Sequence, residues 1–120
     1  MPIEVGIQAT HEFEVDGLLL TDVGGTLGFS VLSTPGMIGM MERNAAMLVF
    51  EHLEPGQATV GFEVCIKHVG AVPEGSVCTA VARLTEIRDG RKLRFDVEVK
   101  AADGRTLGVG THERRIIAVG

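Results

Sequence analysis

Hydrophobic and charged residues alternate over residues 91–101, and this is the most regular stretch of the chain. Hydrophobic residues occupy every second position from Leu93 to Ala101, and charged residues stand between them. Because successive side chains of a strand point to opposite faces, this alternation predicts a strand with one buried face.

Three further runs rich in Val, Thr and Ile surround this strand. Residues 76–88 precede it, residues 105–117 follow it, and residues 58–69 lie further upstream. Asp89-Gly90 and Asp103-Gly104 stand where the runs meet, and such pairs are strong signals of tight hairpin turns. The second half of the chain is therefore predicted to form four antiparallel strands.

One long helix is predicted ahead of these strands. It begins at Thr34-Pro35, with Thr34 as the N-cap and proline at the first helical position, and it ends before Glu54-Pro55-Gly56 after about 18 residues. Its hydrophobic residues cover most of its circumference, which indicates a buried helix. They are Met37, Ile38, Met41, Ala45, Leu48 and Val49.

The order of elements predicts a single α+β domain over residues 1–120, with an antiparallel sheet wrapped around one central helix. A strand near residues 10–16 and a short one near residues 27–33 complete it, separated by a glycine-containing loop at residues 22–28. This arrangement resembles the hotdog fold. One sheet leaves a long edge strand and part of the helix uncovered, so we expect a homodimer or a dimer of dimers.

Composition excludes several classes of function. The net charge is −5 and the chain has no Trp or Tyr, so nucleic acid is not an expected partner. Residues 42–44 are polar and interrupt the longest hydrophobic stretch, and the N-terminus does not resemble a secretory signal, so we expect a cytoplasmic protein without a membrane span. Cys65 and Cys78 lack the spacing of a zinc or redox motif and are interpreted as small buried residues.

Glu42 is the most informative single residue. Helical spacing places it on the same face as Ile38, Ala46 and Val49 rather than on a charged face. Burial there would raise the pKa of its carboxyl group into the range of a general base or nucleophile at neutral pH. The alternative is a structural glutamate bound to a backbone amide or an arginine.

Two further residues extend this hypothesis. Strand alternation places His68 on one face with Phe62, Val64 and Ile66, where it is either a packed core histidine or a catalytic partner of Glu42. Thr34 has a structural role as the expected cap, but its place at a helix N-terminus, where backbone amides are unpaired, also suits the binding of an oxyanion.

Other polar residues carry weaker signals. His112 and Arg114 share a strand face with Gly108 and Gly110, and we expect the glycines to clear space beside the two polar side chains. The remaining basic residues are predicted to form a solvated hairpin tip. The remaining histidines do not have the spacing of metal ligands. The basic residues are Arg88, Arg91, Lys92 and Arg94, and the histidines are His11 and His52.

Several of these residues together resemble the fluoroacetyl-coenzyme A thioesterase family of hotdog proteins. The resemblance covers residues 34–117, and its motifs are Thr34-Pro-Gly-Met-Ile-Gly-Met-Met-Glu42, Gly61, His68 and Gly110-Thr-His-Glu-Arg114. The family carries a Thr, a Glu eight residues later, and a His twenty-six residues after the Glu. The resemblance implies that Thr34, Glu42 and His68 are catalytic and that Gly61, His68 and Arg114 bind substrate.

The resemblance also implies an activity, namely hydrolysis of a small acyl-CoA thioester to free acid and CoA, without a metal and without a cofactor beyond the CoA of the substrate. The family's pair of lid phenylalanines is absent ahead of Thr34, where only Phe29 is near, so the acyl group is left open. Glu42 attacks the thioester directly or activates water. An acyl-thioester hydratase or dehydratase, and an acyl-CoA-binding protein without turnover, are the alternatives.

Overall fold

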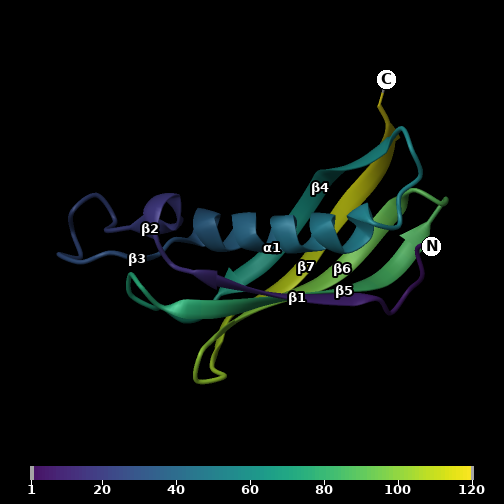
Figure 1. Cartoon of the computed structure of the whole chain (residues 1–120). Coiled ribbons are helices and arrows are strands. Elements are labelled where there is room, and N and C mark those ends of the chain that lie inside the picture. The colour runs from purple at the N-terminus through teal and green to yellow at the C-terminus, as the bar shows by residue number, and fades with distance from the viewer. Residues whose placement is uncertain (1, 120) are drawn as a thin grey trace.

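The computed structural model describes residues 2–119 and places one long helix across one face of a curved antiparallel sheet (Figure 1). The helix is α1 (Thr34–Phe50), and the strand order is β1-β5-β6-β7-β4. The strands are β1 (Gln8–Glu14), β4 (Gln57–His68), β5 (Val77–Arg88), β6 (Lys92–Ala101) and β7 (Thr106–Ala118). This confirms the predicted α+β architecture, including the antiparallel run in the second half.

The two predicted hairpins form at the expected residues. Asp89 and Gly90 both adopt positive φ angles, of 55° and 67°, and join β5 to β6. Gly104, with φ of 89°, lies in the turn between β6 and β7. Gly, Asn and Asp adopt this left-handed region more readily than other residues do, so the turns favour these residue types.

The core lies between the helix and the sheet. The alternation in β6 places Leu93, Phe95, Val97 and Val99 on the helix side, where all four are buried. Asn44 is a buried polar residue of the helix that the hydrophobic pattern did not single out. Its side-chain amide donates to the carbonyl oxygens of Ala9 (3.1 Å) and Ala80 (3.2 Å), which ties α1 to β1 and β5.

The side chain that caps the helix is not the predicted one. Ser33, not Thr34, is the N-cap, and its Oγ accepts a hydrogen bond from the Gly36 amide at 2.9 Å. Thr34 is the first helical residue, so its hydroxyl is free for another partner. A serine directly before a threonine offers two possible caps, and the prediction chose the wrong one.

The segment before the helix is less regular than predicted. Only β3 (Val31–Leu32) forms within residues 27–33, and it pairs with β2 (Leu20–Thr21) in a separate two-stranded sheet. A 3₁₀ turn, η1 (Gly17–Leu19), precedes β2. The predicted first strand exists as β1, which starts and ends two residues earlier.

A β-bulge interrupts β4 and changes which face Phe62 occupies. The register of β4 against β7 shifts between Gly61 and Glu63. Phe62 is therefore 62% exposed, and the guanidinium of Arg115 lies 3.7 Å from the centre of its ring. The predicted alternation is wrong at Phe62, because an extra residue reverses the faces locally, but Val64, Ile66 and His68 are all partly buried beyond the bulge.

The two cysteines occupy different environments. Cys78 is buried in the core, and burial raises the pKa of its thiol. Cys65 is exposed on β4, so the interpretation of two buried cysteines is wrong for this one.

Replacement of Ser33 tests the corrected cap. We expect Ser33→Ala to lower the free energy of unfolding by about 0.5–2 kcal/mol, because the buried Gly36 amide loses its acceptor. Thr34→Ala is the matched control and should cost less, since its hydroxyl bonds an exposed pair. Chemical denaturation of both variants gives the comparison, and a larger cost at Thr34 would contradict the assignment of Ser33 as the cap.

Candidate active site

Thr34 and His68 meet at the N-terminal end of the helix. Thr34 is the first residue of α1, and His68 is the last residue of β4. The Thr34 hydroxyl lies 2.7 Å from His68 Nδ1, a hydrogen-bond distance. A hollow of about 450 Å³ borders both residues and is also lined by Val23, Val31 and Val69. The pair is thus accessible from a partly apolar recess.

The other ring nitrogen of His68 is unusual. Nε2 is buried and has no hydrogen-bond partner among residues 2–119. A buried polar atom without a partner costs roughly 1–3 kcal/mol, and native proteins tolerate such atoms mainly where function needs them. This observation favours a functional histidine over a packed core histidine.

The helix N-terminus offers fewer free amides than expected. The Gly36 amide donates to Ser33 Oγ, the Met37 amide donates to the Ser33 carbonyl, and Pro35 has no N–H. The N–H of Thr34 remains as the candidate donor to an oxyanion at this end of the helix.

Glu42 belongs to a second cluster, formed with Gly61 and Arg114. Its Oε2 lies 3.8 Å from Arg114 Nη1, and a Cβ atom at Gly61 would lie 2.7 Å from the same oxygen. Glycine at this position is therefore what lets the carboxylate rest against β4. The Glu42 side chain is 39% exposed, so the expected burial of this carboxylate is not found within one chain.

Hydrogen bonds to Thr59 of β4 fix the position of the Arg114 guanidinium. Its Nε donates to Thr59 Oγ1 at 2.9 Å, and Nη2 donates to the Thr59 carbonyl at 3.1 Å. Burial of the guanidinium lowers the pKa of Arg114, and the nearby Glu42 carboxylate opposes that shift. Sequence reasoning missed Thr59, although its position two residues before Gly61 on one strand was a signal for a shared face.

The two clusters lie apart within one chain. Thr34 and Glu42 are eight residues apart on the helix, about 12 Å along its axis. Gly61 and His68 are seven residues apart on β4, roughly 20 Å along the strand. The structure therefore brings Thr34 to His68 and Glu42 to Gly61 and Arg114, but it does not bring Glu42 to His68.

The two glycines near His112 have a different role from the one predicted. A Cβ atom at Gly108 would overlap the side chain of Met37, and one at Gly110 would overlap the β4 backbone at Cys65 and Ile66. They permit close packing of β7 against the helix and against β4, rather than space beside His112.

The basic residues of the β5–β6 hairpin are only partly solvated. Arg88 and Arg94 both contact the buried carboxylate of Glu113, at 3.5 Å and 3.0 Å, and Arg115 contacts it at 3.5 Å. Lys92 pairs with Asp89 in the turn at 3.0 Å. Arg88 is exposed, as predicted for a solvated tip, whereas Arg94 is half-buried beside Glu113.

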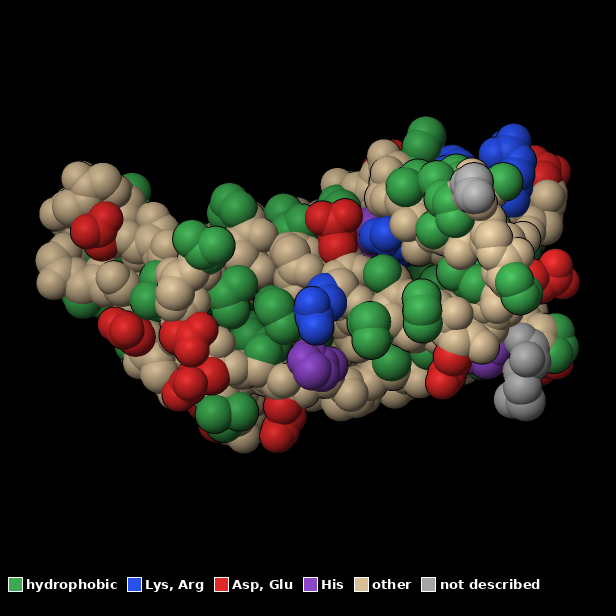
Figure 2. Space-filling model, turned by 45° about the horizontal axis from the view of Figure 1, so that its top comes forward, with side chains coloured by type: hydrophobic (Ala, Val, Ile, Leu, Met, Phe, Trp, Pro, Cys, Tyr) green, Lys and Arg blue, Asp and Glu red, His purple; other side chains and the backbone are tan. Residues whose placement is uncertain are grey.

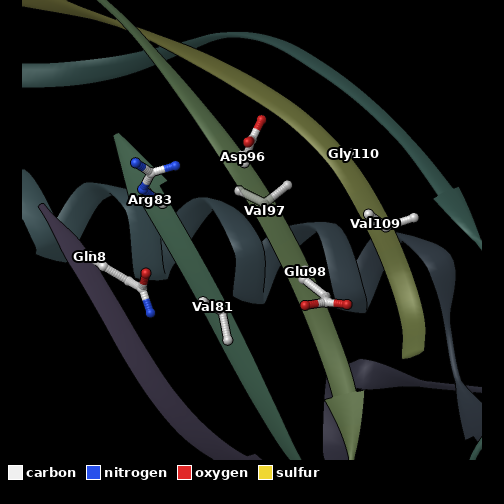
Figure 3. Close-up of a pocket in the computed structure, with 8 residues that line it drawn as sticks. All are labelled: Gln8, Val81, Arg83, Asp96, Val97, Glu98, Val109 and Gly110. Atoms are coloured by element: carbon white, nitrogen blue, oxygen red, sulfur yellow. The ribbon is translucent and has the colours of Figure 1, made fainter. Parts of the chain in front are cut away.

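The opposite face of the sheet carries a separate hollow of about 420 Å³ (Figure 3). Arg83, Asp96, Glu98 and Val109 line it, and none of the predicted site residues does. Across residues 2–119, His, Cys, Asp and Glu side chains form no group of three or more suited to a metal ion. No helix in the same range is long and apolar enough to span a membrane.

Comparison with known proteins identifies the family of this chain. Residues 18–119 match the family described as fluoroacetyl-CoA-specific thioesterase, FlK. A fluoroacetyl-CoA thioesterase from Streptantibioticus cattleyicolor is 38% identical over 88 residues, which are 72% of this chain and 61% of that relative. The chain thus spans about three fifths of the length of this relative.

Two solved structures extend the likeness to the fold. The fluoroacetyl-CoA thioesterase FlK superposes with a TM-score of 0.87 and 29% identity, over 99% of this chain and 91% of that one. A thioesterase superfamily member from Thermus thermophilus superposes with a TM-score of 0.86 and 26% identity, over 98% and 85%. The class defined by the fold and these likenesses is that of the hotdog-fold thioesterases. Within this class, the chain belongs to the fluoroacetyl-CoA-specific thioesterase family.

Replacement of Gly61 tests the Glu42 cluster. We expect Gly61→Ala to leave the free energy of unfolding nearly unchanged, because the only close contact of the new methyl group is the flexible end of Glu42. The methyl group should displace the carboxylate and lower the rate of acyl-CoA hydrolysis, the activity of the family, by roughly 10²-fold. Gly39→Ala, at an open helical position, is the control. A Gly61→Ala variant with the wild-type rate would show that Glu42 does not need its observed place.

Proposed function

We propose that this protein is an acyl-CoA thioesterase that hydrolyses a short acyl-CoA to free acid and CoA. The observation that carries the proposal is the Thr34–His68 hydrogen bond beside a recess, with Glu42 held against Gly61 and Arg114. These five residues occupy the positions at which the family resemblance expects its catalytic and substrate-binding groups. The family match and the 38% identical relative support the reaction class.

Hydrolysis breaks the C–S bond of the thioester and adds water to the acyl carbon. Glu42 serves either as the nucleophile, forming an acyl anhydride that water then cleaves, or as the base that takes a proton from the attacking water. His68, oriented by Thr34, donates a proton to the departing CoA thiolate and regains one from the water that the reaction consumes. Arg114 stabilises Glu42 as a carboxylate. No metal is part of this proposal.

The proposed active site is completed by a second copy of the chain. β4 is an edge strand of twelve residues, and among the described residues nothing pairs with its outer side. Exposed hydrophobic side chains gather near β4 and over the helix, including Val60, Phe62 and Met47 (Figure 2). Proteins usually cover a long edge strand with neighbouring apolar side chains, either with another segment or with a second chain.

A two-fold axis beside β4 would join the two clusters. In an antiparallel pairing of β4 with the β4 of a second copy, a residue that precedes the axis in one strand lies opposite a residue that follows the axis in the other strand. An axis at Cys65 would set Phe62 of one subunit opposite His68 of the other, and the β-bulge brings the adjacent Gly61 onto the same face as His68. Glu42 of one subunit would then approach the Thr34–His68 pair of its neighbour, and the partly exposed carboxylate would become buried.

The activity is tested with a panel of short acyl-CoA thioesters, with free thiol and free acid both measured. We expect Glu42→Gln to abolish most turnover without loss of folding stability, because glutamine keeps the shape but cannot act as base or nucleophile. After single turnover in H₂¹⁸O, label in Glu42 would identify the anhydride route with water attacking the Glu42 carbonyl carbon, because the base route places label in the free acid alone.

Other outcomes would identify a different function. Acyl-CoA binding without release of acid would indicate a binding protein, and addition of water to an enoyl-CoA would indicate a hydratase. A Glu42→Gln variant with a near wild-type rate would remove Glu42 from the mechanism.

The shared site is tested by mixing two inactive variants, Glu42→Gln and His68→Ala. In a mixed dimer one site carries both substitutions and the other carries neither, so random mixing should restore about a quarter of the wild-type activity. The same mixture made with Glu42→Gln and Gly61→Ala is the control, because both residues belong to one cluster and no intact site forms. Absence of recovery in dimers shown to exchange, or a stable monomer in light scattering, would contradict the shared site.

A further inference from the structure

His112 is a buried histidine that the proposed mechanism does not use. Its side chain is 1% exposed, and its ring stacks on Phe95 with ring centres 6.0 Å apart and an angle of 26° between the planes. Both ring nitrogens have polar neighbours, Nδ1 at 2.8 Å from the Glu63 carbonyl oxygen and Nε2 at 3.2 Å from Arg114 Nη1. The ring is thus fixed on both edges and on one face.

These two neighbours define a single protonation state of His112. A carbonyl oxygen only accepts, so Nδ1 must carry the proton. A guanidinium only donates, so Nε2 must be the unprotonated acceptor. His112 is therefore a neutral imidazole that donates to Glu63 and accepts from Arg114.

The charged groups around His112 agree with this state. Burial lowers the pKa of His112 and so does the charge of Arg114, whereas the hydrogen bond to Glu63 and the carboxylates of Glu42 on the helix and Glu113 on β7 act in the opposite direction. The burial effect is the largest of these, so the neutral form is favoured in the folded protein.

The β4 bulge supplies the acceptor for His112. The register of β4 shifts between Gly61 and Glu63, and the Glu63 carbonyl oxygen beside this shift lies 2.8 Å from His112 Nδ1. The same irregular segment contains Gly61, against which Glu42 rests. One backbone feature therefore serves both His112 and Glu42.

His112 affects the position of Arg114 Nη1, the guanidinium nitrogen that faces Glu42. Thr59 accepts one hydrogen bond from Nε and one from Nη2, so these two nitrogens are anchored and the direction of Nη1 depends on its other contacts. It lies 3.2 Å from His112 Nε2 and 3.8 Å from Glu42 Oε2. The first distance is a hydrogen bond, and the second is an ion pair without one.

We propose that His112 is a positioning residue that holds Arg114 Nη1 beside Glu42 without letting it clamp the carboxylate. Arg114 then stabilises the charge of Glu42 while the oxygen lone pairs stay available for attack or for proton abstraction. Without an acceptor at His112, Nη1 would turn to Glu42 and form a direct charge-assisted hydrogen bond, the stronger kind, which would reduce the reactivity of the carboxylate. This inference rests on the proposed role of Glu42.

Two variants separate positioning from packing. His112→Gln places an amide oxygen near the former Nε2 and can still accept from Arg114, whereas His112→Asn keeps only a donor near Glu63. We expect His112→Gln to retain kcat within a few-fold, and His112→Asn to lose roughly 10²-fold in kcat with little change in KM. Equal losses in the two variants, or a loss that appears in KM alone, would overturn the proposal.

The tautomer is measured on the wild-type protein without substrate. Long-range ¹H–¹⁵N NMR of the imidazole at neutral pH should report a protonated Nδ1 and a bare Nε2 for His112, and this readout needs no variant to fold. An Nε2–H tautomer or an imidazolium would overturn the inference and leave the proposed function standing. Absence of thioester hydrolysis by the wild-type protein would instead remove the proposed function, so the two failures are distinguishable.

Discussion

The close approach of β7 to its neighbours is the constraint on which the rest of the structure depends. At Gly108 the strand touches the methionine side chain of the helix at position 37, and at Gly110 it lies directly against the backbone of β4. A side chain at Gly110 would force β7 away from the β4 backbone, and one at Gly108 would require the buried end of Met37 to move. These two glycines thus permit the close packing of β7 against the helix and against β4.

The position of β4 in turn decides which polar groups meet. β4 carries the glycine at position 61, the bulge after it and the histidine at position 68, and it supplies Thr59 and the Glu63 carbonyl to residues of β7. By strand alternation, a strand without the bulge would place Phe62 on the helix side. The polar network therefore depends on an irregularity of the backbone as much as on the side chains.

The network is built mainly from backbone acceptors and neutral groups, with few charges. Arg114 is surrounded by a hydroxyl, a carbonyl and an imidazole nitrogen, and one carboxylate lies at ion-pair distance. These neutral acceptors take three hydrogen bonds from the guanidinium without neutralising its charge. The remaining positive charge is directed at Glu42, which gives a physical reason for an arginine at this position.

The sequence by itself determined the parts of the structure that depend on local chemistry. The alternation around Phe95, the hairpin at Asp89-Gly90 and the apolar helix could all be predicted, because side-chain period and turn preference act over a few residues. The spacing of Thr34, Glu42 and His68 also indicated the family. The tertiary structure alone decided that Ser33 caps the helix, that Phe62 lies outside, and that Glu42 and His68 belong to different clusters. These outcomes depend on packing between segments distant in the sequence, and neither periodicity nor spacing encodes how a bulge or a close glycine contact shifts one strand against another.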